Sequence, residues 1–284
     1  MSDAGDPLEA LSRCVDFETF RPILLKGLKY SDGSLGGRPP YDPVLMFKVL
    51  ILAAQNNVSD EKMAFLIRDR LSWMRFLGLE PGDPMPDANT IRVFRERLGQ
   101  RKTLKKLFQH FDQVLSRAGY APRGGQIVDA TLVSAPRQRM KENERQAVKD
   151  GHKAGDIWPD APHKAAQKDV DARWTMKFKK GQNGHQDIAI PHYGYKSHIA
   201  IDRRYRRVRT CVVTNAARDD GYILPEGITR ANTSGEGWAD SAYRSKANET
   251  FLKENGLLSR IHRKKPRDKS MPAHISRGNS RRSA

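Results

Sequence analysis

Cysteine is scarce in this chain, which has only Cys14 and Cys211 among its 284 residues. The two cysteines lie far apart and neither belongs to a CxxC motif. Small secreted domains held by disulfides, and zinc ribbons, both need several closely spaced cysteines. The sequence therefore excludes these two classes of protein.

Long hydrophobic runs are also missing. No apolar stretch approaches the ~20 residues that a helix needs to cross a bilayer. The N-terminus, Met-Ser-Asp-Ala-Gly-Asp-Pro, is acidic and lacks the apolar segment of a secretory signal peptide. We therefore predict a cytoplasmic protein without a membrane partner.

Acidic residues are outnumbered, with 33 Asp and Glu against 51 Lys and Arg, which gives a formal net charge of +18. A charge excess of this size destabilises a compact chain through self-repulsion. It favours binding to a polyanion, because each phosphate that a cation neutralises releases counterions. The composition thus favours a protein that binds nucleic acid over the alternative, a soluble basic enzyme that does not bind nucleic acid.

Helical patterns dominate the first part of the chain, up to about Gly119. Asp42 is a predicted N-cap, followed by proline in the first turn, and a second helix is predicted to start at Ser59. A third starts after Asp87, and a fourth covers about residues 103–118. We predict an all-α N-terminal domain from these starts and their apolar stripes.

The helix that follows Asp87 carries arginines outside its apolar stripe, among them Arg92 and Arg95. A short turn followed by such a helix is typical of a helix-turn-helix that contacts DNA. An ordinary helical bundle with a solvated basic face explains the pattern equally well. Both interpretations stay open at this point.

The pattern changes to short β-branched strands after Gln126. We expect strands over 127–133, 193–201, 208–214 and 237–240, the middle two joined as a hairpin, and then a helix and a strand near 258–262. Residues 134–190 are polar and are predicted to be a long insertion with little core of its own. From residue 263 onward we expect a loose basic tail.

Two aspartates, Asp129 and Asp240, lie in these short hydrophobic strands. Burying an unpaired charge costs several kcal/mol, so each needs an explanation. Either one alone is explained by a helix cap or an ion pair. Together, on strands of one sheet, they suggest oxygen ligands for Mg²⁺ or Mn²⁺, with two ions expected, and hence phosphoryl transfer on nucleic acid.

Several motifs appear in one order along the chain. They are the stretch Asp87-Ala-Asn-Thr-Ile-Arg-Val-Phe-Arg-Glu-Arg-Leu98, the strand Ile127-Val-Asp-Ala-Thr-Leu-Val133, the segments Asp171-Ala-Arg-Trp-Thr175 and Tyr193-Gly-Tyr-Lys-Ser-His198, and Trp238-Ala-Asp-Ser-Ala-Tyr-Arg-Ser245. In this order and spacing the chain resembles bacterial insertion-sequence transposases of the DDE type, close to the insertion-sequence-five family.

The resemblance implies an α/β fold class. An RNase H-like mixed sheet with flanking helices follows a helical DNA-binding domain. The expected domains are a DNA-binding domain over 1–120, a catalytic domain over 121–262 that contains the 134–190 insertion, and a basic tail over 263–284.

The resemblance also implies a function. The chain would bind terminal inverted repeats and target DNA as a homo-oligomer, associated with the bacterial nucleoid, and would cleave and transfer DNA strands at Asp129 and Asp240. The third acidic residue of such a site is a glutamate farther along the chain, and no glutamate follows Glu254. The chain is thus expected to be C-terminally truncated, with a non-catalytic DNA-binding remnant or inhibitor of a full-length transposase as the alternative.

Other basic side chains are candidates for DNA contacts. Lys196 and His198 share one face of their strand, Arg204 belongs to the hairpin turn, and Arg244 follows Asp240 closely. For each, a solvated surface position or a packing role is the competing interpretation. The full set of candidate DNA contacts is Arg92, Arg95, Lys196, His198, Arg204 and Arg244.

Overall fold

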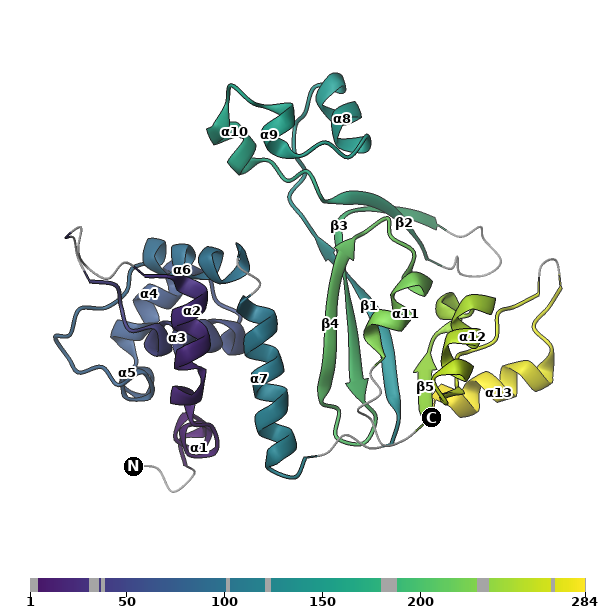
Figure 1. The fold of residues 1–284 in the computed structure, drawn as a ribbon, viewed down its shortest axis with the longest axis horizontal. Helices are drawn as coiled ribbons and strands as arrows, with labels where there is room; N and C mark the ends of the chain where they lie inside the picture. Colours follow the sequence, from purple (N-terminus) through teal and green to yellow (C-terminus); the bar gives the residue numbers. More distant parts are fainter. Residues whose placement is uncertain are drawn as a thin grey trace. The chain divides into compact units, whose positions relative to one another are not determined.

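The computed structural model divides the chain into two compact units, residues 1–119 and residues 120–284 (Figure 1). It describes residues 5–30, 36, 39–100, 103–120, 124–179, 188–228, 235–266 and 269–283. Across this described part of the chain, no helix is both long enough and apolar enough to cross a bilayer. The class of the chain is mixed α/β, as the sequence predicts.

The described residues of the first unit form helices. Their bounds are α1 (Pro7–Cys14), the 3₁₀ turn η1 (Phe17–Phe20), α2 (Arg21–Leu28), α3 (Pro43–Asn56), α4 (Asp60–Asp69), α5 (Leu71–Leu77), α6 (Ala88–Gln100) and α7 (Thr103–Arg117). One apolar core joins them, and its most buried members include Leu24, Leu52, Ile67 and Ile91, each 0% exposed.

Three of the predicted helix starts in this unit are confirmed. The Asp42 carboxylate accepts hydrogen bonds from the backbone N–H of Val44 (2.8 Å) and Leu45. Ser59 caps α4, and the Asp87 carboxylate accepts from the Thr90 N–H (2.7 Å). These side chains satisfy N–H groups that a helix leaves unpaired at its first turn, which explains why the helices begin there.

The second unit contains strands and short helices. Their bounds are β1 (Gln126–Ser134), α8 (Glu142–Lys149), α9 (Ala154–Ile157), α10 (Pro162–Gln167), β2 (Arg173–Lys179), β3 (Ile188–Asp202), β4 (Val208–Asn215), η2 (Asp220–Ile223), α11 (Leu224–Gly227), β5 (Glu236–Ala239), η3 (Ser241–Tyr243), α12 (Lys246–Glu254), β6 (Leu258–Ser259) and α13 (Ala273–Ser283).

The strands form one mixed sheet in the order β2–β3–β1–β5–β6, and β4 also pairs with β3. Strand β3 is long: its first half pairs with β2 and its second half with β4, both antiparallel. Strand β1 is antiparallel to β3 on one side and parallel to β5 on the other. The predicted hairpin of 193–201 and 208–214 is therefore confirmed as β3 and β4.

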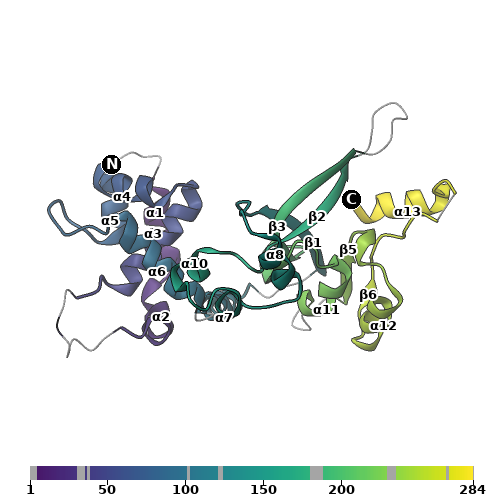
Figure 2. The same cartoon turned by 90° about the horizontal axis from the view of Figure 1, so that it is seen from above.

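A compact core lies on one face of this sheet, where α11 and α12 pack (Figures 1 and 2). Val128 of β1 and Ala239 of β5 contribute to it from the strands, and Leu224 and Leu252 from the helices. Side chains alternate along a strand, so the next residue of β1, Asp129, points to the opposite face. Asp129 is accordingly exposed.

The structure adds elements to one polar segment and corrects the expectation for another. The range 134–190, predicted to be a long insertion with little core of its own, contains α8, α9, α10, β2 and the start of β3, although residues 180–187 lie outside the described part. The range 263–284 is not a loose tail, because the helix α13 covers half of it. The Asn279 side chain fixes α13 by accepting from the Arg263 N–H and donating to the Arg263 carbonyl, each at 3.0 Å.

The segment α8–α10 is organised around a carboxylate, that of Glu144. Its Oε1 accepts from the Lys164 ammonium (2.5 Å) and from the indole N–H of the buried Trp158 (2.8 Å). These bonds, and one from the Lys141 N–H, lower the pKa of Glu144 to about 2. A polar network therefore replaces the apolar core that this segment lacks.

We expect Glu144→Gln to loosen this segment selectively, since the amide cannot pair with Lys164 as a charge. Because folding lowers the pKa of Glu144 from 4.5 to about 2, its stabilising effect is complete above pH 4.5. The effect is lost as the pH falls through 4.5 toward 2. Limited proteolysis between residues 142 and 167 as a function of pH measures both results.

The control for this prediction is Glu142→Gln, on the same helix, where the carboxylate pairs with the exposed Arg145. Equal protease sensitivity of the two variants would contradict the role of Glu144.

Candidate functional site

The first predicted carboxylate, Asp129, lies in the middle of β1. Its neighbours along the strand are held by pairing with β3 on one edge and with β5 on the other. Its Oδ1 accepts from the N–H of Ala130 at 2.8 Å. The side chain is thus exposed, while its backbone belongs to the best-connected strand of the sheet.

The second predicted carboxylate, Asp240, directly follows β5. It is the N-cap of the short turn η3, where its Oδ1 accepts from the Ala242 N–H at 2.9 Å. The residue is exposed. The cap fixes the carboxylate at the carboxyl end of β5.

The sheet register brings the two aspartates together. In the parallel pair of β1 and β5, Val128 lies opposite Ala239. One residue farther along both strands, Asp129 lies beside Asp240. Adjacent strands are about 4.8 Å apart, so the two aspartates are neighbours across the β1–β5 pair.

This pair carries uncompensated negative charge. No Lys or Arg in the described part of the chain forms an ion pair with Asp129 or Asp240. In a chain with a net charge of +18, that isolation is informative, because two adjacent like charges repel unless a cation joins them.

A third carboxylate, that of Asp220, acts on the same buried side chain as the pair. Burial, followed by the charges of Asp220, Asp129 and Asp240, raises the pKa of the Tyr243 phenol. All three aspartates therefore act on one side chain, which is 1% exposed. The side-chain amide of Asn248 links the turn that contains Asp220 to the turn that Asp240 caps, since it donates to the carbonyls of Gly221 and Tyr243, each at 2.7 Å.

Asp220 was not among the residues predicted from the sequence for this region. The only signal available was the pair Asp219-Asp220 at the start of a short helix, which is also an ordinary capping pattern. Asp220 lies 2.8 Å from the ammonium of Lys196, one of the predicted DNA contacts. Lys196 also donates to the Arg218 carbonyl (2.7 Å), so its charge is already engaged within the fold.

His198, another predicted DNA contact, is buried at 1% exposed. One ring nitrogen, Nε2, lies 2.9 Å from the Thr214 hydroxyl, and burial lowers the pKa of the imidazole. A buried neutral ring does not meet a phosphate in solvent. His198 is therefore not among the residues that we propose to contact DNA.

The arginines predicted to contact DNA in the first unit are exposed and partly paired. Arg92 donates to Glu96 (2.6 Å) on its own helix, and Arg95 pairs with Asp60 of α4. The Arg95 pair helps to hold α4 against α6. In the second unit, Arg204 is exposed in the turn between β3 and β4.

Arg244, the last of these candidates, belongs to a group of basic residues that only the structure brings together. Burial, followed by the charges of Arg263, Arg244 and Arg260, lowers the pKa of Arg282. Arg244 also donates to the Ile261 carbonyl (3.0 Å), and the Arg282 guanidinium donates to Asn279 (3.1 Å). We call Arg244, Arg260, Arg263 and Arg282 the arginine cluster.

The described residues contain no group of three His, Cys, Asp or Glu arranged to hold a metal ion. The pair Asp129 and Asp240 nevertheless fits Mg²⁺ chemically. This ion is usually held by one or two carboxylates and completes its octahedral shell with waters and substrate phosphate oxygens. Two exposed carboxylates without cationic partners match that requirement.

Comparison with known proteins adds one finding. Residues 1–97 match the family model described as Transposase domain (DUF772). No solved structure matches the chain. The matched region contains α1 to α5 and most of α6, and it supports a transposase family for the chain.

Proposed function

We propose that this chain is a DNA transposase of the DDE type, close to the insertion-sequence-five family, with Asp129 and Asp240 as its metal-binding carboxylates. The observation that carries the proposal is the β1–β5 register, which sets Asp129 of β1 beside Asp240 at the carboxyl end of the parallel strand β5. The transposase match over residues 1–97 supports it independently, because it involves none of the residues of this site.

The order of the strands supports an RNase H-like catalytic domain. Strands β4, β3 and β1 form an antiparallel meander, and β5 and β6 extend the sheet parallel to β1. Helices α11 and α12 cover one face. Such a sheet sets Asp129 of β1 beside the carboxyl end of β5, as a two-carboxylate site requires.

Mg²⁺ or Mn²⁺ bound at such a site, with two ions expected, supplies Lewis-acid stabilisation and an activated water or 3′-hydroxyl for cleavage of a phosphodiester. The protein's part is to hold two carboxylates at a fixed separation. The β1–β5 pairing sets that separation, and the Ala130 and Ala242 N–H groups orient one oxygen of each carboxylate. The partner is double-stranded DNA, at terminal inverted repeats and at the target, bound by a homo-oligomer.

Basic side chains of the same unit are suited to the DNA backbone. The arginine cluster lies beside α12 and β6, which flank β5, and Arg204 is exposed in the turn after β3. Arginine contacts phosphate through a planar fork of donors and stays charged at any physiological pH. We assign these residues to phosphate contacts, and Arg92 and Arg95 to the same role in the first unit.

Incubating the purified chain with a linear DNA end tests the proposal. We expect duplex binding that weakens steeply with salt, and slow nicking that needs Mg²⁺ or Mn²⁺. Asp150 is an exposed carboxylate at the end of α8. Its variant Asp150→Asn serves as the control and should leave duplex binding and nicking unchanged.

The absence of a third metal ligand among the described residues favours a second candidate, a DNA-binding protein without catalysis that inhibits a full-length transposase. Salt-sensitive binding with no nicking in either metal would establish this second function. Failure to bind DNA at 50 mM salt would exclude both.

A further inference from the structure

A cavity of the second unit lies between α8, the start of β2 and the middle of β3. Its volume is about 320 Å³. Four cationic side chains and two aromatic rings line it: Arg137, Arg145, Lys149, Arg173, Trp174 and Tyr193. No Asp or Glu is among the lining residues, so the cavity selects against cations and favours an anion with a flat apolar part.

The aromatic wall is formed by Trp174 of β2 and Tyr193 of β3. These residues are partners in the strand register, and their ring centroids lie 5.3 Å apart. Trp174 is 51% exposed, and the Arg137 guanidinium lies 5.0 Å from its ring centroid. A half-exposed indole with an arginine beside it offers a stacking surface of the kind that proteins use for unpaired bases.

The cations of the cavity divide into two kinds. Arg173 is structural, since it donates to the carbonyls of Val170 (2.6 Å) and Val148 (2.9 Å) and so ties β2 to α8. Arg137 and Lys149 form no ion pair within the described part of the chain. Arg145 pairs only with Glu142, and both side chains are more than half exposed.

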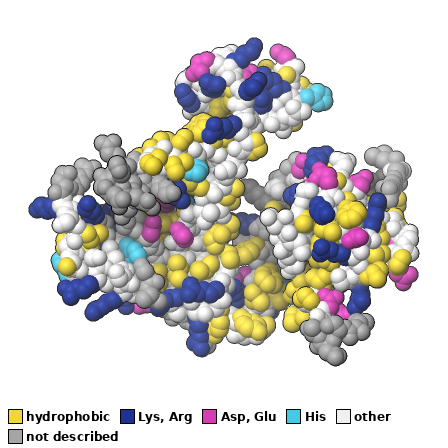
Figure 3. Space-filling view, turned by 180° about the vertical axis from the view of Figure 1, so that it is seen from behind, with side chains coloured by type: hydrophobic (Ala, Val, Ile, Leu, Met, Phe, Trp, Pro, Cys, Tyr) yellow, Lys and Arg dark blue, Asp and Glu magenta, His cyan; other side chains and the backbone are white. Residues whose placement is uncertain are grey.

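The three available cations, Arg137, Arg145 and Lys149, approach the cavity from two directions. Arg137 comes from the segment after β1, and the other two come from α8. The space-filling view shows Lys and Arg side chains, with some Asp and Glu among them, over the α8–α10 segment (Figure 3). The phosphate groups of a molecule that enters the cavity therefore meet positive charge on either side of the aromatic wall.

Resting on the proposed function, we propose that this cavity binds one unpaired nucleotide of a DNA strand. The base stacks on Trp174, and the flanking phosphates contact Arg137, Arg145 and Lys149. A volume of about 320 Å³ is at the lower end for ligand pockets, which suits a single nucleotide.

The location of the cavity fits this role. Strand β1 leads to it from the carboxylate pair, because Ser134 pairs with Gly194 and the Ala135 N–H donates to the Tyr193 carbonyl (3.0 Å). Ala135 follows Asp129 by six positions along the chain, which in an extended strand spans about 20 Å. The cavity would thus hold a base displaced from the helix at a fixed distance from the cut.

Binding of two DNA ends tests the proposal: a blunt duplex, and the same duplex with a single-stranded overhang that contains 2-aminopurine. We expect wild-type protein to prefer the overhang and to quench the 2-aminopurine by stacking. Trp174→Ala should weaken overhang binding by about 5- to 150-fold and abolish the quenching. Arg137→Ala should weaken it too and lower the salt slope by about 0.7.

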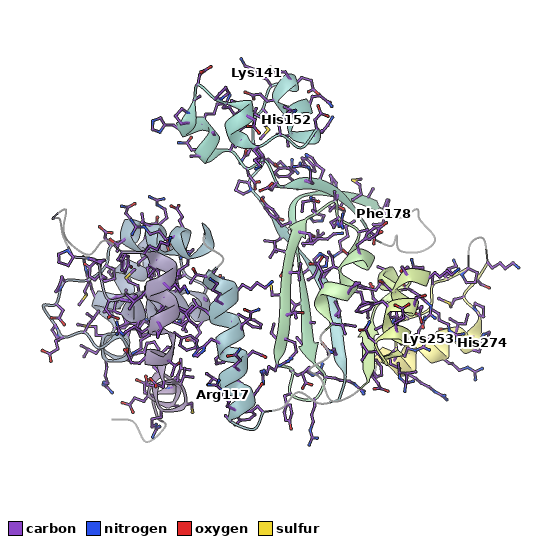
Figure 4. The ribbon with its side chains drawn as sticks, viewed as in Figure 1. Arg117, Lys141, His152, Phe178, Lys253 and His274 are labelled. Atoms are coloured by element: carbon purple, nitrogen blue, oxygen red, sulfur yellow. The ribbon has the colours of Figure 1, made fainter. Side chains whose placement is uncertain are left out.

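Two matched controls come from the same segments. Phe178→Ala removes an exposed ring on the same face of β2, farther along the strand and outside the cavity (Figure 4). Arg139→Ala removes a charge two residues from Arg137 that does not line the cavity. Both should leave overhang binding and quenching unchanged, and all four variants should bind the blunt duplex as wild type does.

Several results would overturn the inference. If wild type binds both DNA ends equally, or if Trp174→Ala weakens both to the same extent, the cavity does not hold an unpaired nucleotide, while the proposed DNA function stands. If a free deoxynucleotide binds as tightly as the overhang, the cavity is a mononucleotide site. Loss of all DNA binding in wild type would instead refute the proposed function itself.

Discussion

Asp129→Asn is expected to lower the rate of metal-dependent DNA nicking by about 10³-fold while leaving duplex binding unchanged. Asparagine has nearly the same shape and keeps the Oδ1 that accepts from the Ala130 N–H, so the strand is not disturbed. It removes one of the two adjacent charges that hold the metal. The nicking rate and the duplex affinity of the same preparation measure the two effects.

A stability measurement in metal-free buffer provides the internal control. Since Asp129 and Asp240 lie side by side without cationic partners, removing one charge relieves repulsion and should raise the free energy of unfolding by up to about 1 kcal/mol. Asp129→Asn protein that is less stable than wild type, with unchanged nicking, would show that the residue is structural and not a metal ligand.

Gly194→Ala is expected to give the largest loss of stability, at least about 3 kcal/mol. Gly194 has φ +150°, and a Cβ there would lie 2.1 Å from the Val133 carbonyl oxygen and 2.7 Å from the Ala135 nitrogen. Both atoms are backbone, so the clash can be relieved only by moving β1 away from β3. The midpoint temperature of thermal unfolding should fall by about 6–12 °C.

Gly151→Ala separates the clash from the cost of positive φ. Gly151 has φ +86°, but a Cβ there meets nothing within 4 Å. Its loss of stability should be only about 1 kcal/mol. Similar losses in the two variants would mean that close approach of β1 and β3 at Gly194 does not limit the fold.

Much of the secondary structure was predictable, because it is encoded locally. Asp42, Ser59 and Asp87 mark helix starts through their own side-chain hydrogen bonds, and the β-branched runs of β1, β3 and β4 mark strands. Helix α13 was missed for a physical reason. It is fixed by hydrogen bonds between Asn279 and the Arg263 backbone, and a single amide leaves no periodic pattern.

The candidate site was predictable only in part. An aspartate inside an apolar strand is conspicuous, so Asp129 and Asp240 could be selected from the sequence. Their register across β1 and β5, the proximity of Asp220, and the arginine cluster depend on which strands and helices become neighbours. The prediction for His198 failed in a different way. Strand alternation gave the correct face of β3 for this side chain, but the sequence did not show that this face is buried at that position.

Titration of Mn²⁺ into wild type, Asp129→Asn, Asp240→Asn and the double variant, followed by calorimetry, tests the central claim most directly. Asparagine also caps helices well, so the η3 turn survives in the Asp240 variant. If the two carboxylates form one site, either single substitution should weaken Mn²⁺ binding nearly as much as both together. Full Mn²⁺ affinity in both single variants, or losses that simply add in the double variant, would contradict a shared metal site.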